Sequence, residues 1–113
     1  MYNILEHCGV KARIVFDPEI ELFRGEILGL SGSADFYAAD VNSLKSELET
    51  SLDTYIEVCK ERNIEPYKSY NGRILFRTKS ETHQKLEALA VAKGISVNKL
   101  LDKMVENEIS AMN

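Results

Sequence analysis

The chain has 113 residues, enough for one domain or two very small ones. With 44% hydrophobic and 28% charged residues, it can bury a core and remain in solution. No run approaches the roughly 18 consecutive apolar residues of a membrane span, so we expect no membrane partner. The opening MYNILEHCG lacks the basic-then-apolar pattern of a secretory signal, and we therefore expect a cytoplasmic protein.

The net charge of −4 is unevenly distributed along the chain. Residues 1–71 carry seven Lys and Arg against thirteen Asp and Glu, a net charge of −6. Residues 72–113 carry seven against five, and the stretch 72–99 alone has six against two, a net charge of +4. We expect the second part of the chain to meet an anion and the first part to meet a cationic partner.

The first part of the chain is predicted to form an antiparallel meander of three strands. Segment 11–19 alternates apolar and polar residues and stops at an Asp-Pro turn signal. Segment 20–30 is predicted as a second strand, in which Gly25 marks a bulge or kink, and 34–39 as a short third strand. The short connections favour antiparallel neighbours.

From Asp40 to about Arg62 the apolar period becomes helical. Asp40 is the predicted N-cap and Asn63 the predicted end of this helix. An amphipathic helix needs an apolar surface to pack on, and the meander supplies one. The predicted apolar stripe consists of Val41, Leu44, Leu48, Leu52, Tyr55, Ile56 and Cys59.

After a linker, the second part of the chain is predicted to contain a strand, a helix, a tight turn and a second helix. Pro66 and the Asn-Gly pair that ends EPYKSYNG indicate a linker, so we predict domains at 1–66 and 72–113, joined by 67–71. The stretch GRILFRT then alternates as a short strand, 73–78.

Two helices follow this strand. Segment 80–94 is predicted as a helix with Ser80 as N-cap and Gly94 at its end, and segment 96–112 as a helix capped by Ser96. The predicted apolar residues of the two helices are Leu86, Leu89, Ala90, Val97, Leu100, Leu101, Met104, Val105 and Ile109.

A six-residue strand in this position has no sheet to join, and a unit of about 42 residues is near the size below which chains rarely fold alone. Pairing with a second copy across a two-fold axis would satisfy the backbone of both strands. Ile74 and Phe76 would then face a core of four helices, while Arg73, Leu75 and Arg77 would face outward. Such a ribbon fits the DNA major groove, where Arg can donate two hydrogen bonds to guanine and an apolar group can touch a thymine methyl.

The turn KGISVNK adds a predicted phosphate site beside this ribbon. The backbone N–H groups of Val97 and Asn98 lie at the positive end of a helix dipole, behind the cap Ser96. Lys93 and Lys99 add charge, and phosphate contacts of this kind hold the register while the ribbon reads bases.

Residues 72–112 resemble a ribbon–helix–helix DNA-binding domain of the Arc and MetJ type. The whole chain resembles the HicB family of antitoxins in three stretches: ARIVFDPEIELFRGEILGL, DVNSLKSELETSLDTYIEVCKERNIEPYKSYNG and RILFRTKSETHQKLEALAVAKGISVNKLL. The resemblance implies an α+β fold, with a degenerate RNase-H-like unit of three strands and a helix before the DNA-binding domain. Its implied partners are operator DNA and a small basic HicA-type toxin that cleaves mRNA.

The resemblance also implies roles for individual residues. Arg73, Leu75 and Arg77 occupy the base-contacting positions of the strand, although Leu75 stands where these domains often have a polar residue. A proline often follows the strand in the family, where this chain has Lys79. The phosphate-contacting residues are predicted to be Lys79, Lys93, Ser96, Val97, Asn98 and Lys99.

The acidic residues of the first part are predicted to form a solvated surface or a toxin-facing patch. The predicted toxin-facing residues are Asp17, Glu19, Glu21, Glu26 and Asp35. They also invite a nuclease interpretation, because RNase-H-type chemistry uses carboxylates that converge on two metal ions. Three of them crowd one turn and a strand start, so we predict that the chain is not an enzyme.

No cofactor and no metal are predicted. His7 and Cys8 could combine with Cys59 or His83 as metal ligands, but no spacing of a known zinc type is present. Cys59 lies on an apolar helical stripe, which favours a buried thiol. Two cysteines also make no disulfide framework.

The resemblance, together with the charge division and the alternating strand, implies an antitoxin that neutralises a toxin through its first domain and represses its own operon as a homodimer or a higher even-numbered oligomer. Two alternatives stay open. The chain could be a stand-alone ribbon–helix–helix regulator without a toxin, or an acidic inhibitor that does not bind DNA.

Overall fold

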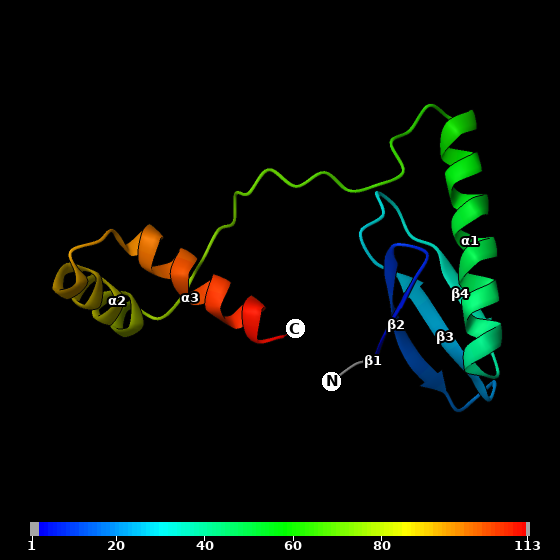
Figure 1. Cartoon of the computed structure of the whole chain (residues 1–113), viewed down its shortest axis with the longest axis horizontal. Coiled ribbons are helices and arrows are strands. Elements are labelled where there is room, and N and C mark those ends of the chain that lie inside the picture. Colours follow the sequence, from blue (N-terminus) through cyan, green and yellow to red (C-terminus); the bar gives the residue numbers. More distant parts are fainter. Residues whose placement is uncertain (1–2, 113) are drawn as a thin grey trace. The chain divides into compact units, whose positions relative to one another are not determined.

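The computed structural model describes residues 3–112 and divides the chain into two units, one up to Asn71 and one from Gly72 onward (Figure 1). The first unit contains β1 (Asn3–His7), β2 (Val10–Asp17), β3 (Leu22–Ile27), β4 (Asp35–Ala38) and α1 (Val41–Glu61). The second unit contains α2 (Ser80–Lys93) and α3 (Val97–Ala111). The fold is therefore α+β, as predicted. None of the helices in this described part has the length and apolar character needed to cross a bilayer.

The four strands form one antiparallel sheet in the order β1-β2-β3-β4. The antiparallel meander is confirmed, but the predicted number of three strands is wrong, because β1 was missed. β1 joins β2 through the two-residue turn Cys8-Gly9, with φ angles of 54° and 75°. Positive φ at both positions is what a type I′ hairpin turn requires. Cysteine is not among the residues that are typical of this turn, so the sequence pattern did not predict the hairpin.

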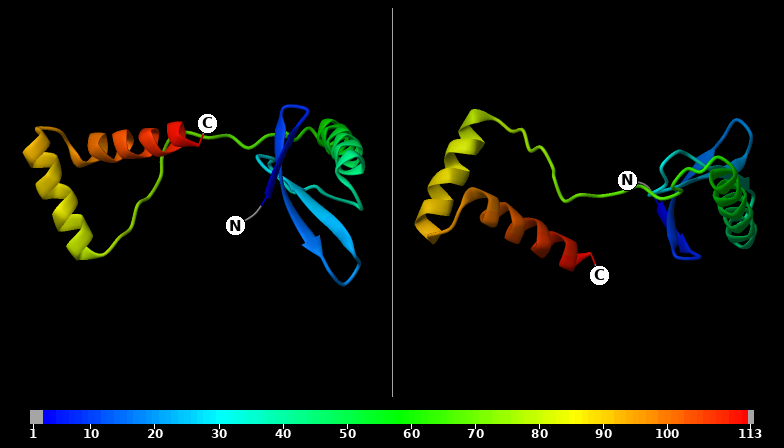
Figure 2. Two further views of the ribbon diagram at one scale, coloured as in Figure 1. Left: turned by 60° about the horizontal axis from the view of Figure 1, so that its bottom comes forward. Right: turned by 90° about the horizontal axis from the view of Figure 1, so that it is seen from above.

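Helix α1 packs on one face of the sheet, and the apolar core lies between them (Figure 2). Leu48 of α1 and Ala12 of β2 are fully buried there. Gly25 of β3 pairs in regular register with Ile14 and Phe36, so the predicted bulge or kink is wrong. A Cβ atom at Gly25 would overlap the ring of Phe36. The absence of a side chain therefore makes room for that ring in the core.

The predicted ends of α1 are confirmed. The Asp40 carboxylate accepts hydrogen bonds from the backbone N–H and the hydroxyl of Ser43, at 2.8 and 3.1 Å. These bonds lower the pKa of Asp40. At the other end Asn63 adopts a φ of 56°, and the N–H of Ile64 donates to the carbonyl of Cys59 at 2.8 Å. This is the Schellman pattern of a helix C-terminus.

The chain after α1 runs back along the loop between β3 and β4 before it leaves the first unit. Tyr67 forms an isolated antiparallel bridge with Leu30 in the loop between β3 and β4. The N–H of Ser31 donates to the Pro66 carbonyl at 2.9 Å, and the N–H of Lys68 donates to the Gly29 carbonyl at 2.8 Å. Two residues of the predicted linker, at positions 67 and 68, therefore lie against the first unit.

In the second unit α2 and α3 pack together through a tight turn. Gly94 ends α2 with a φ of 69°, and Ser96 caps α3 by accepting a hydrogen bond from the Lys99 N–H at 3.0 Å. Both assignments were predicted. The predicted N-cap Ser80 is wrong by one residue: Lys79 holds that position, without a side-chain cap bond.

Candidate nucleic-acid interface

Residues 73–79, which contain the predicted strand 73–78, have no regular secondary structure (Figure 1). The strand prediction is therefore wrong for the single protomer. The physical reason is that a strand needs a neighbour for its backbone groups, and no described strand pairs with this segment.

The second unit exposes most of its large apolar side chains. Within residues 72–112 only Ala90 and Leu100 are buried. Ile74 is 91% exposed and Leu75 77% exposed, more than a stable core would leave in water. Further exposed apolar side chains are Phe76, Leu89, Val91, Met104, Val105, Ile109 and Met112. The predicted apolar stripe of α3 thus exists, but its second half, at Met104, Val105 and Ile109, has no partner surface in the protomer.

Phe76 marks the side of the segment that faces the helices. It lines one groove together with Leu86 of α2 and with Val97 and Leu101 of α3. Arg77 lines the same groove, and Arg73 is exposed. The segment therefore combines apolar groups that can enter a core with two guanidinium groups that water can reach.

The predicted phosphate site keeps its local geometry. Ser96 accepts from the N–H of Lys99, so the N–H groups of Val97 and Asn98 remain at the start of α3 without an acceptor in the helix. Lys93 is the last residue of α2, one short turn away. Lys79 differs from the other predicted phosphate contacts, because it lies at the opposite end of α2.

The five predicted toxin-facing residues fall into two groups. Glu19 and Glu21 are exposed in the turn between β2 and β3, where the Asp17 carboxylate accepts from the Glu19 N–H at 3.0 Å. Glu26 and Asp35 are direct cross-strand neighbours on β3 and β4. The second pair lies on the face of the sheet turned away from α1, because the alternate residues of β3 enter the core.

Arginines pair with the two carboxylates on this open face. Arg13 contacts Glu26 at 2.6 Å and Arg24 contacts Asp35 at 2.6 Å. The Asp35 carboxylate raises the pKa of Arg24 through this hydrogen bond and its charge. These acids are therefore partly neutralised within the sheet, whereas Glu19 and Glu21 project from a turn.

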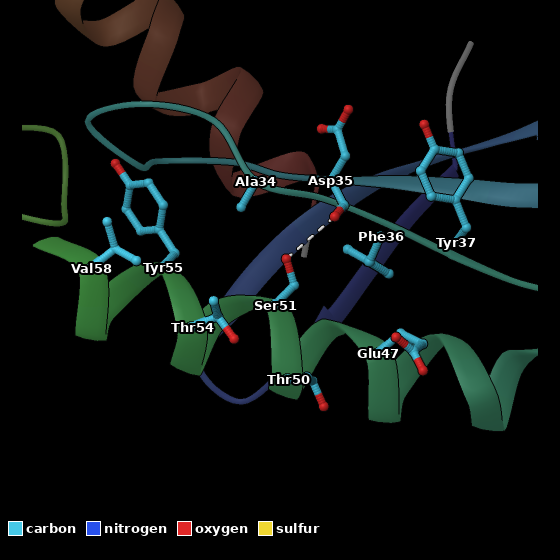
Figure 3. Close-up of a pocket in the computed structure, with 10 residues that line it drawn as sticks. All are labelled: Ala34, Asp35, Phe36, Tyr37, Glu47, Thr50, Ser51, Thr54, Tyr55 and Val58. Atoms are coloured by element: carbon cyan, nitrogen blue, oxygen red, sulfur yellow. Dashed lines mark hydrogen bonds between the residues drawn. The ribbon is translucent and has the colours of Figure 1, made fainter.

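An open groove runs between the edge strand β4 and helix α1 (Figure 3). Glu47, Thr50 and Thr54 come from the helix side, and the Ser51 hydroxyl donates to the Asp35 carbonyl at 3.3 Å. Tyr55 lies at one end, and its hydroxyl accepts from the Gly32 N–H at 2.6 Å. The lining is mixed and has no concentration of charge that would define a catalytic centre.

One constellation was missed by sequence reasoning. His7 and Cys8 do not meet Cys59, which is buried as predicted near the end of α1. Instead both lie against Glu49, with His7 Nε2 at 2.6 Å and Cys8 Sγ at 3.5 Å from Glu49 Oε1. The sequence holds no signal for this contact, since the residues are more than 40 positions apart.

A model of the HicB family matches residues 55–105. The matched span runs from the last part of α1 through segment 73–79 and α2 into α3. Over these residues, somewhat less than half of the chain, the sequence is similar to the HicB family. That family suggests a function related to toxin–antitoxin systems. No curated protein and no solved structure matches the chain.

Proposed function

We propose that this HicB-like chain is an antitoxin that dimerises through residues 72–112, binds operator DNA with the resulting ribbon, and neutralises a basic mRNA-cleaving toxin with its first unit. In this proposal the second unit is a ribbon–helix–helix domain and the first a degenerate RNase-H-like module. Neither unit performs catalysis. The observation that carries the proposal is the exposed, alternating segment 73–78 beside an exposed apolar stripe on α3.

Dimerisation follows from the backbone and the apolar side chains together. Two copies of segment 73–78 would satisfy each other's N–H and C=O groups as an antiparallel pair. The same pairing would bury Ile74 and Phe76 with the α3 stripe. An edge with these properties associates with another strand unless it is protected. The second copy supplies that protection.

DNA recognition would then rest on the opposite face of the ribbon. Arg73 and Arg77 would donate to guanine edges, and Leu75 would contact a thymine methyl. The N–H groups of Val97 and Asn98, with Lys93 and Lys99, would hold flanking phosphates. The net charge of +4 over residues 72–99 favours this partner.

Toxin recognition would rest on the first unit, whose net charge of −6 over residues 1–71 attracts a basic partner. Glu19 and Glu21 are the strongest candidates within it, because arginines already pair with Glu26 and Asp35. Steric cover of the toxin would suffice, without chemistry from this chain.

The DNA-binding test uses the full chain and the DNA segment upstream of its own gene. The double variant R73A/R77A removes four arginines from the dimer, and at about 1–3 kcal/mol each it should lose at least about 4 kcal/mol of specific binding, that is about 10³-fold or more in affinity. The control K85A/K103A also removes two positive charges per chain, but from exposed lysines of the two helices. It should weaken binding far less. Equal affinity of R73A/R77A and the wild type would rule out the ribbon as reader.

The alternatives give different results in the same experiments. An acidic inhibitor without DNA binding would show no salt-dependent affinity, whereas a repressor loses affinity steeply as salt rises. A stand-alone regulator would bind DNA but co-purify with no small basic protein. For the toxin contact, E19Q/E21Q should weaken co-purification, while E106Q/E108Q in the second unit should not. Nuclease activity with added Mg²⁺ or Mn²⁺ would contradict the non-enzymatic role.

A further inference from the structure

We propose that His7, Cys8 and Glu49 form a binding site for a zinc-type divalent ion that joins the β1–β2 hairpin to helix α1. One ligand atom from each of the three side chains lies within 4.8 Å of the other two. His7 ends β1, Cys8 is the first residue of the hairpin turn, and Glu49 lies in the middle of α1. The proposed site is in the first unit and is independent of the proposed DNA interface.

The donor set fits zinc by its chemistry. A thiolate sulfur, an imidazole nitrogen and a carboxylate oxygen are the three ligand types that Zn²⁺ uses in proteins. Magnesium and calcium prefer oxygen ligands alone, so the cysteine and the histidine discriminate against them. Three protein ligands leave one tetrahedral position for water or for a group from a bound partner.

The two distances that involve Glu49 also fit after a small adjustment. Tetrahedral zinc with a sulfur at about 2.3 Å and an oxygen at about 2.1 Å places these two atoms ~3.5 Å apart. Cys8 Sγ and Glu49 Oε1 are 3.5 Å apart. A nitrogen and an oxygen on the same ion would be ~3.3 Å apart. His7 Nε2 and Glu49 Oε1, at 2.6 Å, need only to separate by a fraction of an ångström.

Hydrogen bonds bring the ligands together in the metal-free protein. The Glu49 carboxylate accepts hydrogen bonds from His7 and Cys8, and these bonds lower the pKa of Glu49. Desolvation, and after it the Glu49 and Asp53 carboxylates, raise the pKa of Cys8. Asp53 lies one turn after Glu49 on α1, and its negative charge favours a cation at this place.

Binding would exchange these protons for the ion. The Cys8 thiol releases its proton to solvent, and its sulfur donates an electron pair to the metal. The His7 ring, which donates from Nε2 in the metal-free protein, changes to the tautomer with its proton on Nδ1, so that the lone pair of Nε2 can bind the metal. The Glu49 carboxylate then binds the metal ion instead of accepting the two hydrogen bonds. His7 and Cys8 are partly or fully exposed, so an ion can reach them without opening the core.

The test uses the full chain, kept reduced and stripped of metal with a chelator, and Co²⁺ and Zn²⁺ as probes. Cobalt in this site should produce a thiolate-to-metal charge-transfer band and the visible bands of tetrahedral geometry, at one ion per chain. Zinc should displace it. The variants C8S, H7A and E49Q should lose this signal while circular dichroism shows that each is folded.

The matched controls are C59A and H83Q, which remove the buried cysteine and the histidine of α2. Both should keep the cobalt spectrum. A second measurement is the thermal midpoint, which zinc should raise in the wild type and in both controls but not in C8S. The site is refuted if the wild type shows no charge-transfer band, or if the band persists in C8S. Loss of the band in either control, or a stoichiometry of one cobalt ion per two chains, would also refute it.

Discussion

Replacing Ile74 by alanine tests whether the second unit is completed by a second copy. Ile74 is 91% exposed in the protomer, so its truncation should leave the protomer's own stability almost unchanged. In the proposed dimer it enters the core from both chains. Removing three carbons at about 0.8 kcal/mol each costs about 2.4 kcal/mol per chain and about 5 kcal/mol per dimer. The dimer dissociation constant should therefore rise by a factor on the order of 10³.

The neighbouring residue provides the matched control for this experiment. Leu75 is 77% exposed and of similar size, but alternation places it on the outward face of the ribbon. L75A should change the dissociation constant by less than about fivefold, the size expected for two surface substitutions. Sedimentation equilibrium over a concentration series measures both variants. Equal weakening by I74A and L75A, or a wild-type protein that stays monomeric, would refute the reasoning.

Three further substitutions test the local structure. G25A should destabilise the first unit by about 1–3 kcal/mol in urea denaturation, because the new methyl group meets the Phe36 ring; unchanged stability would contradict that close packing. S96A should cost about 1 kcal/mol and speed amide hydrogen exchange in the first turn of α3, whereas unaltered exchange would mean that the cap bond from Lys99 contributes nothing. D40N tests pH dependence. Hydrogen bonds from Ser43 lower the pKa of Asp40 below its ordinary 3.8, so the ionised carboxylate stabilises the fold above that pH. This contribution is lost as the pH falls through the lower pKa of the folded state. The stability difference between D40N and the wild type should therefore shrink below pH 3.8, and a difference that is constant with pH would contradict this assignment.

The candidate site was predictable from the sequence in its local parts. The alternation of segment 73–78, the end of α2 at Gly94 and the cap at Ser96 all depend on neighbouring residues. The solvent exposure of the α3 stripe was not predictable in the same way, because an apolar stripe at helical spacing is usually buried in its own chain. Only the structure places residues such as Met104 and Ile109 in solvent. That exposure is the basis for proposing a second copy.

The first unit separates local from long-range information in the same way. Helix α1 and its caps at Asp40 and Asn63 follow from a period of 3.6 residues and from bonds between near neighbours. Strand β1 was missed because its signal is a Cys-Gly turn, which forms the hairpin only when the strand register holds it. Gly25 likewise needed the position of Phe36 across the sheet to be understood.

The sequence by itself determined the order of the elements from β2 to α1, the two helices of the second unit, most of the helix ends and the division of charge between the two units. These features depend on side-chain period and on contacts within one helical turn. Tertiary structure alone decided which charges are paired, as between Arg24 and Asp35, and which distant side chains meet, as His7 and Cys8 do at Glu49. Such contacts join residues far apart in the chain. Their geometry is set by the packing of α1 on the sheet and by strand register, which no local pattern encodes.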